Sequence, residues 1–242
     1  MRPTVFDFAT HSLSLISRNW VEMLRISAVR VLIYIVAVVA LEVALWSSPL
    51  FDGSRAVFYV GLTVCIEMVF IAWLAVPWHR YVLLSERQGW RASIPGRATL
   101  SYALWAVLLI AGAFLPVIAL APFGWLGGGF PFVVGILAFG LVLFGLYVGF
   151  RLSLVLPSIA VGRPLRLAEV WSLTGPHRAV IAGVLALIIG VYLLVGWVGI
   201  LLESLHPALI VAATPLSWLS LLFDVSVLTT LYGHIVEDRP LT

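Results

Sequence analysis

The stretch AVIAGVLALIIGVYLLVGWVGILL, residues 179–202, decides the fold. It holds no charged residue and no histidine, whereas Arg178 precedes it and Glu203 follows it. A helix of about 20 apolar residues, rising 1.5 Å per residue, is long enough to cross about 30 Å of hydrocarbon. The stretch therefore predicts a transmembrane helix.

Five other stretches of the chain meet the same length requirement. Lipid offers no partner for an unpaired backbone N–H or C=O, and the alternation expected of a barrel strand is absent, so each stretch is expected to be a helix. The composition agrees, because 62% of the 242 residues are hydrophobic and 10% are charged, against about a quarter charged in soluble proteins. We predict an all-α integral membrane helix bundle, a single domain over residues 1–242, with six transmembrane helices plus cytoplasmic interfacial amphipathic helices. The predicted spans are 26–46, 57–78, 100–120, 132–156, 179–202 and 208–232.

The basic residues orient this bundle. All 14 are arginines, and all but Arg55 fall on one side of the path that the six spans define. By the positive-inside rule, that side is cytoplasmic, and it carries both termini. The single Cys65 excludes an intrachain disulfide.

Two segments on the arginine-rich side are amphipathic. The first, residues 5–20, is predicted to lie in the plane of the membrane interface. The second, residues 164–174, starts with a proline and ends before Gly175-Pro176, which are typical start and stop signals of a helix. Both are expected to cover the cytoplasmic rim of the bundle, and the alternative is a face on which a partner docks. The apolar arc of the first segment comprises Val5, Phe6, Ala9, Leu13, Ile16 and Trp20, and that of the second Leu167, Ala168, Val170 and Trp171.

The segment RLSLVLPSIAVGRPLRLAEVWSLTGPHR, residues 151–178, resembles a pattern of bacterial multi-span proteins. The pattern includes the membrane domain of glycerophosphoryl diester phosphodiesterases and related families of unknown function. The resemblance implies a six-helix scaffold in a bacterial inner (plasma) membrane and brings no catalytic residue, because a soluble barrel of about 250 residues has no room here. The matching positions are Arg151, Pro157, Gly162, Trp171 and Leu173-Thr174-Gly175.

Four ionisable residues within or near the spans form a candidate intramembrane polar site: Glu67, Asp224, Arg151 and Arg30. A charge at the bilayer centre costs about 2.5 to 3.5 kcal/mol on insertion scales, so each needs a reason. Glu67, near the midplane, is either an ion, proton or ligand site or a hydrogen-bonded contact between helices. Asp224 is expected to pair with Arg151 or with Arg30, because a buried charge persists only with a partner.

The remaining polar residues predict no chemistry. Glu42 and Glu203 are expected at the outer rim, and His79-Arg80 and His177-Arg178 are expected to contact lipid headgroups. No metal site and no cofactor are expected, because the histidines are dispersed without ligand spacing. The histidines are His11, His79, His177, His206 and His234.

Small residues recur at four-residue spacing in the fourth and fifth spans. Such stripes let helix backbones approach closely, and they predict helix packing at these positions. They are Gly145 and Gly149 in one span, and Ala182, Ala186 and Gly190 in the next.

From the sequence we expect a non-enzymatic integral inner-membrane protein that acts as a scaffold, accessory or interaction subunit. Its expected partners are the lipid bilayer, anionic lipid headgroups and other membrane-protein subunits, and no nucleic acid is expected. The alternative is a small transporter or lipid-handling permease with an intramembrane carboxylate site. A solvated cavity that reaches Glu67 favours the permease, whereas tight packing with Glu67 hydrogen-bonded to a neighbouring helix favours the scaffold.

Overall fold

The structure of the chain is a computed structural model, which describes residues 3–46, 53–87, 89, 94–120, 123, 130–206 and 214–241. These residues form helices and short connections and contain no strand. Six of the helices are long and apolar enough to cross a membrane. The predicted all-α membrane helix bundle is therefore confirmed.

The helices follow the predicted order. The predicted spans correspond to α2, α3, α4, α5, α8 and α9, and the two amphipathic segments correspond to α1 and α7. The elements are α1 (Val5–Arg18), α2 (Trp20–Trp46), α3 (Gly53–Leu84), α4 (Arg97–Leu120), α5 (Phe130–Leu152), α6 (Val155–Ala160), α7 (Leu167–Thr174), the 3-10 turn η2 (Gly175–His177), α8 (Arg178–Leu205) and α9 (Thr214–Ile235).

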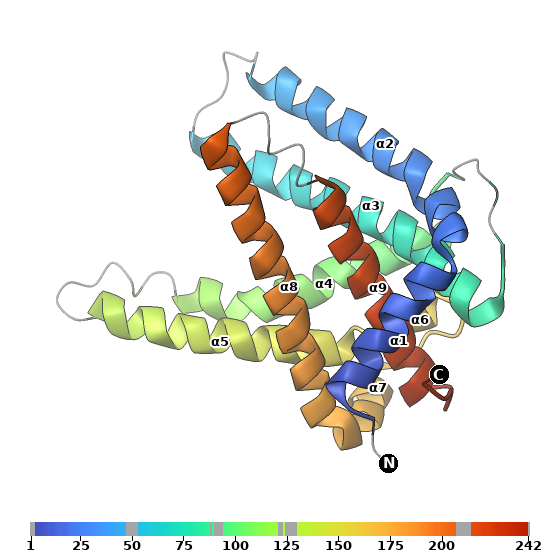
Figure 1. Cartoon of the computed structure of the whole chain (residues 1–242). Coiled ribbons are helices and arrows are strands. Elements are labelled where there is room, and N and C mark those ends of the chain that lie inside the picture. The colour runs from blue at the N-terminus through green and yellow to red at the C-terminus, as the bar shows by residue number, and fades with distance from the viewer. Residues whose placement is uncertain are drawn as a thin grey trace.

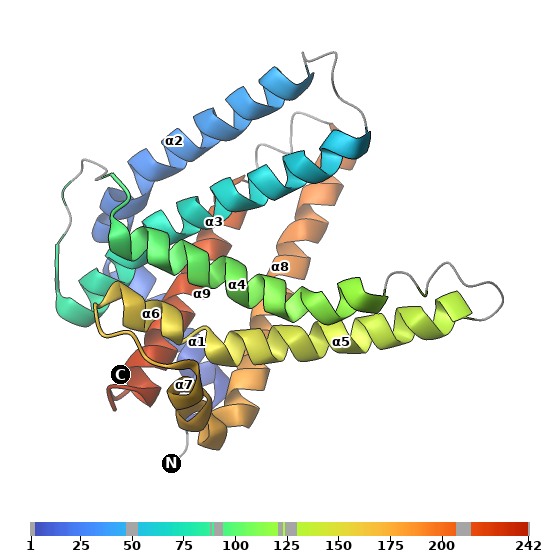
Figure 2. The same ribbon diagram turned by 180° about the vertical axis from the view of Figure 1, so that it is seen from behind.

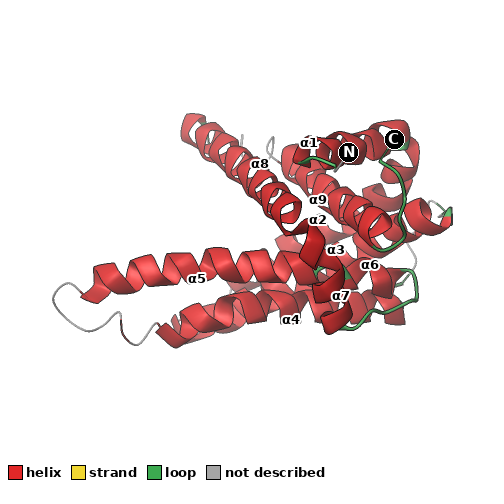
Figure 3. Cartoon of the chain, turned by 90° about the horizontal axis from the view of Figure 1, so that it is seen from below, coloured by secondary structure: helices red, strands yellow, loops and turns green. Residues whose placement is uncertain are grey.

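The six long helices form a fan (Figures 1 and 2). The pairs α2–α3, α4–α5 and α8–α9 are each in contact, and the α4–α5 pair points away from α8 (Figure 3). Both termini, α1, α6 and α7 gather where the pairs converge, and we call this end the hub (Figure 1). The helices are therefore close together at the hub and diverge away from it.

Helix α9 is the centre of the bundle. It contacts α1, α3, α6 and α8, and 67% of its span is buried inside the protein, against 6% for the span 132–160. The side chains of Ser226, Thr229 and Thr230 are buried on it. Small side chains let helices approach closely, and the hydroxyls of Thr229 and Thr230 donate to carbonyls of α9 itself.

The first amphipathic helix packs across α9. The Ser12 hydroxyl of α1 lies 3.1 Å from the hydroxyl of Thr230, and Phe8 meets the His234 ring edge-on at 5.5 Å. This packing buries one part of the predicted apolar arc and leaves another part exposed, since Ala9 is buried. Three of its large members, Phe6, Leu13 and Trp20, recur every seven residues and are 76%, 54% and 58% exposed.

The helices differ from the predicted spans in their bounds. Helix α2 begins at Trp20, so the last residue of the predicted amphipathic segment 5–20 belongs to α2 and not to α1. Within the predicted span 132–156, α5 ends at Leu152 and the chain turns into the separate helix α6. Beyond the predicted span 57–78, α3 continues through Pro77 to Leu84. Residues 208–213 of the last predicted span and the side chain of Glu42 lie outside the described part of the chain.

The two predicted packing stripes lie in different surroundings. Gly145 meets α4, where an added Cβ would lie 2.3 Å from the carbonyl oxygen of Ala113, and Gly149 faces Leu109 and Ala113 of the same helix. The stripe on α8 turns outward instead. Its residues Ala182, Ala186 and Gly190 are exposed, and no atom of the described residues lies within 4 Å of a Cβ added at Gly190. The fan arrangement accounts for this difference, because α8 contacts α5 near the hub and diverges from it beyond.

Candidate functional site

Glu67 borders a cavity between α2, α3, α8 and α9. The cavity has a volume of about 230 Å³, and we call it the Glu67 cavity. The Glu67 side chain is exposed and, within the described residues, forms no hydrogen bond and no ion pair. Its polar neighbours in the lining are Tyr34, Tyr192, Thr214 and Ser217.

Asp224 borders a second and larger cavity. This Asp224 cavity has a volume of about 340 Å³ and lies between α3, α4, α5, α8 and α9, with Leu156 of α6 at one end. Its lining is mainly apolar, and Asp224 is its single charged side chain among the described residues. The other polar side chains in the lining are Tyr102 and Ser153.

The two cavities are stacked along one face of α9. Ser217 and Leu221 border the Glu67 cavity, whereas Asp224 and Leu228 border the Asp224 cavity. The spacing of four, three and four residues places these positions on the same side of a helix. Ile71 of α3 borders both cavities. Together they follow α9 from Thr214, at its far end, toward the hub.

The predicted partners of Asp224 are engaged elsewhere. Arg151 lies at the hub end of α5, and its side chain is 6% exposed. Its guanidinium donates to the Thr174 hydroxyl at 3.1 and 3.2 Å and to the Trp171 carbonyl at 2.9 Å. It also stacks on the Trp171 ring at 3.6 Å. The expected ion pair with Asp224 is therefore not formed.

Arg30 does not pair with Asp224 either. It is 1% exposed, donates to the Ile26 carbonyl of its own helix, and lies 5.4 Å from the centre of the Trp73 ring. The ring face offsets part of the charge of the guanidinium. Its Nε and one terminal nitrogen are buried without a hydrogen-bond partner in the described structure.

A buried polar chain connects three helices beside the Asp224 cavity. Nδ1 of His79 lies 2.8 Å from the Thr229 hydroxyl, and Nε2 lies 3.2 Å from the Tyr102 hydroxyl. All three side chains are at most 2% exposed. The expectation that His79 contacts lipid headgroups is therefore wrong.

The error at His79 follows from the predicted end of the second span. Placing that end at Trp78 put His79 outside the bundle, whereas α3 continues to Leu84 and keeps His79 in the interior. Sequence reasoning also missed the tyrosines, because Tyr102 and Tyr192 carry no pattern that separates a site residue from a packing residue. An apolar span that continues through a proline, with a histidine just after it, is the signal that could have identified His79.

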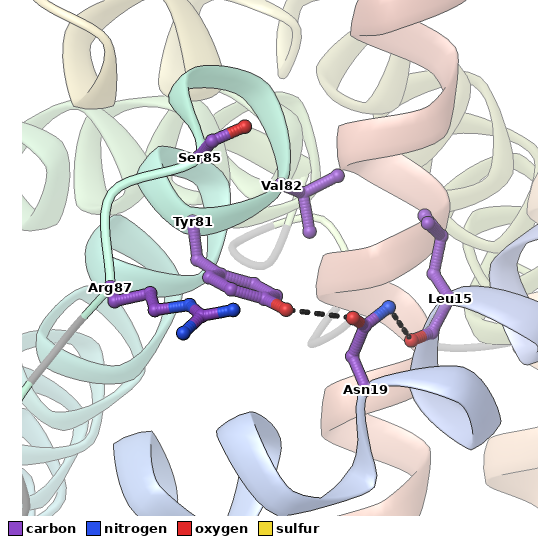
Figure 4. A pocket seen from close by; sticks show the side chains of 6 residues that line it. All are labelled: Leu15, Asn19, Tyr81, Val82, Ser85 and Arg87. Carbon is purple, nitrogen blue, oxygen red and sulfur yellow. Dashed lines mark hydrogen bonds between the residues drawn. The ribbon is translucent and has the colours of Figure 1, made fainter.

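A third cavity lies at the hub, on the arginine-rich side of the chain (Figure 4). Its volume is about 300 Å³, and Arg87 is its charged lining residue. The Tyr81 hydroxyl donates to Oδ1 of Asn19 at 2.7 Å, and Nδ2 of Asn19 donates to the Leu15 carbonyl at 2.8 Å. These bonds tie the junction of α1 and α2 to the end of α3. The full lining comprises Leu15, Asn19, Tyr81, Val82, Ser85 and Arg87.

The fold and the stacked cavities define the chain as a six-span, all-helical membrane protein with carboxylates facing intramembrane cavities. No protein family, curated protein or solved structure matches the chain. Among the described residues no three His, Cys, Asp or Glu side chains group in a way that could hold a metal ion.

Proposed function

We propose that the chain is a non-enzymatic permease of a bacterial inner membrane, a small transporter or lipid-handling protein whose solute passes the carboxylates of Glu67 and Asp224. One observation carries the proposal: Glu67 and Asp224 border two stacked cavities, and neither carboxylate has a hydrogen bond or ion pair in the described structure. Of the two alternatives that the sequence left open, this is the arrangement expected of a permease.

The energetic argument concerns the cost of a carboxylate in hydrocarbon. A Glu or Asp that joins helices recovers part of this cost through hydrogen bonds to a neighbouring helix. Glu67 makes no such bond among the described residues, so its insertion cost of about 2.5 to 3.5 kcal/mol is not offset by packing. A solute that uses the carboxylate accounts for its presence.

The charge of the path favours cationic solutes. Among the described residues, each cavity carries one carboxylate and neither lining includes an arginine or a histidine. A negative group within low-dielectric walls raises the local concentration of cations and repels anions. The solute is therefore a cation, or an amphiphile with a cationic group.

The arginine distribution supports the orientation of this permease. With the hub on the cytoplasmic side, both termini are cytoplasmic. The exposed residues Phe6 and Leu13 of α1 and Trp20 at the start of α2 then enter the lipid interface. Arginines near an anionic membrane surface each contribute about 1 kcal/mol of attraction. Arg87, at the hub cavity, is one such residue, so anionic headgroups are proposed partners of this side.

The proposal requires water at Glu67, which thiol labelling can measure. Cys65 is exposed, and two residues along α3 place it about 200° from Glu67. We expect Glu67→Cys in a Cys65→Ser background to react with a charged, membrane-impermeant methanethiosulfonate, because the reagent attacks the thiolate, which needs water. The native Cys65, on the opposite side of α3 from Glu67, is the matched control and should stay unlabelled. If both cysteines stay unlabelled to the same extent, the result would favour the scaffold function over the permease.

A second function, an interaction subunit, is favoured by the outward stripe of α8. Ala182, Ala186 and Gly190 are exposed small residues, and such a stripe lets a helix of another subunit approach closely. Replacing Ala186 with Leu would block that approach. If the chain extracted in mild detergent migrates as a larger species on a native gel and the variant migrates alone, the subunit function gains support. A chain that always migrates alone argues against it.

A further inference from the structure

We propose that the Asp224 cavity binds a protonated amine carried on a compact apolar body. The proposal names the ligand class for one part of the permease path and so rests on the proposed function. It goes beyond a general preference for cations, because the hydrogen-bond directions around the cavity require a ligand that donates.

The buried chain beside the cavity fixes the direction of each hydrogen bond. The Thr229 hydroxyl donates to the Val225 carbonyl at 2.7 Å, so toward His79 it can only accept. Nδ1 of His79 therefore carries the proton and donates to Thr229 at 2.8 Å. Burial without a carboxylate in hydrogen-bond contact keeps the imidazole neutral, so Nε2 has no proton and accepts from the Tyr102 hydroxyl at 3.2 Å.

Tyr102 consequently has no proton left for a ligand. A phenol has one proton, and in Tyr102 it points to His79, which leaves only the lone pairs of the oxygen. The hydroxyl of Ser153, which also lines the cavity, has no proton free for a ligand either, because it donates to the Phe150 carbonyl at 2.7 Å. The carboxylate of Asp224 accepts as well. All three polar side chains of the lining are thus acceptors, and the cavity offers no side-chain donor among the described residues.

The rest of the lining sets the body of the ligand. Ala106, Leu109 and Phe114 of α4 and Ile188 of α8 line the cavity, so its walls are apolar. A volume of about 340 Å³ lies within the range of small-molecule sites, in which apolar walls bind the body and a few polar groups orient it. A cationic N–H group at Asp224 with a compact hydrocarbon body matches both parts.

The site should bind compounds that are chemically close to a protonated amine less tightly. An anion is repelled by Asp224, a neutral alcohol lacks the charge, and a quaternary ammonium carries the charge but has no N–H to give to Asp224, Tyr102 or Ser153. Hydrogen bonds between charged groups are strong enough that their loss changes affinity by about tenfold or more. The site should therefore distinguish primary from quaternary ammonium.

The test is calorimetric titration of the purified full chain in detergent with four probes that share one hydrocarbon cage. They are adamantan-1-amine, its N,N,N-trimethyl derivative, adamantan-1-ol and adamantane-1-carboxylate. We expect the amine to bind at least about tenfold more tightly than each of the other three. Equal affinities for the amine and the trimethyl derivative would overturn the proposal, and so would tighter binding of the carboxylate.

Three variants locate the binding. Asp224→Asn keeps the size of the side chain and removes an unpaired charge, so the chain should still fold, and its affinity for the amine should fall at least about tenfold. Ile189→Trp should weaken binding by filling the cavity that Ile189 lines, with the elution profile checking the fold. Glu203→Gln, at an exposed position of α8 in neither lining, should leave binding within about twofold of the native chain. Native affinity in Asp224→Asn would sink the assignment.

Uptake of the same amine into vesicles separates this proposal from the permease. Binding that depends on Asp224 without uptake by the native chain supports the ligand class and refutes transport of this amine. Uptake that Glu67→Gln abolishes while binding persists supports both. If the native chain takes up the amine but binding does not depend on Asp224, the ligand site is refuted and the permease proposal is not.

Discussion

The guanidinium carbon of Arg151 lies 3.6 Å from the centre of the Trp171 ring, and the same group donates to the Thr174 hydroxyl and to the Trp171 carbonyl. Trp171 and Thr174 belong to α7, whereas Arg151 is in the last turn of α5. One side chain therefore fastens the surface helix to the end of a span. The three residues are members of the segment 151–178 that suggested a multi-span pattern, and the contact gives their spacing a physical reason.

Replacing Arg151 with Lys should destabilise the protein by about 1 to 3 kcal/mol, because an ammonium keeps the charge but loses the planar stack and the forked hydrogen bonds. Thermal unfolding in detergent, followed by tryptophan emission, measures the change. Arg178→Lys, at an exposed position, is the matched control and should unfold like the native chain. A native-like melting temperature for the Arg151 variant would contradict this role.

The polar chain of His79, Tyr102 and Thr229 predicts a non-additive pair of substitutions. Thr229→Val should cost about 1 to 3 kcal/mol, because it leaves the Nδ1–H of His79 buried without an acceptor. In a His79→Leu background no such N–H exists, so the same Thr229→Val change should cost close to nothing. Denaturation of the native chain, the two single variants and the double variant closes the cycle. Additive effects would show that His79 does not donate to Thr229.

The sequence predicts the six spans well and the site poorly, for one physical reason. The length of an apolar run determines whether a helix can cross the hydrocarbon, so α2, α3, α4, α5, α8 and α9 follow from local composition. The neighbours of a residue depend instead on the rotation and tilt of its helix, which packing determines. Depth alone made Arg151 a plausible partner for Asp224, although it faces α7.

The cavities illustrate the same limit. Glu67 could be identified from its place in an apolar span, but the space beside it exists because α2, α3, α8 and α9 diverge away from the hub. No residue pattern within one helix encodes that divergence. Gly145 shows the opposite case, since a glycine at four-residue spacing did indicate a close helix contact, although the partner helix is α4.

The contact at Gly145 predicts a sharp difference between two glycines of α5. A Cβ at Gly145 would lie 2.3 Å from the Ala113 carbonyl oxygen, whereas a Cβ at Gly140 meets no atom within 4 Å in the part of the chain that the structure describes. Gly145→Ala should therefore force α4 and α5 apart at a cost of about 1 to 3 kcal/mol. Gly140→Ala should be neutral or stabilising by up to about 1 kcal/mol, since Ala favours a helix. Melting temperatures of both variants measure this, and a stable Gly145→Ala protein would contradict the close approach.

The start of α1 should respond to acid. Hydrogen bonds from the backbone and side chain of Thr4 lower the pKa of Asp7 below its ordinary value. A lowered pKa in the folded state stabilises the helix start above the unfolded value of about 3.9, and this stabilisation is lost as the pH falls through the folded pKa. Hydrogen exchange of residues 4–18, corrected for the intrinsic rate, should therefore show weaker protection at pH 3 than at pH 6. In Asp7→Asn, which has no carboxyl to titrate, protection should be the same at both pH values.

The orientation of the bundle predicts which loops share a side. In a Cys65→Ser background, Arg87→Cys and Arg166→Cys should both react with a membrane-impermeant maleimide only after the cytoplasmic face is opened, because the positive-inside rule places both on that face. Glu203→Cys, exposed near the far end of α8, should react in intact cells. Labelling of Arg87→Cys and Arg166→Cys from opposite faces would require an odd number of crossings between them. That result would contradict the pairing of α4 with α5 as a membrane hairpin.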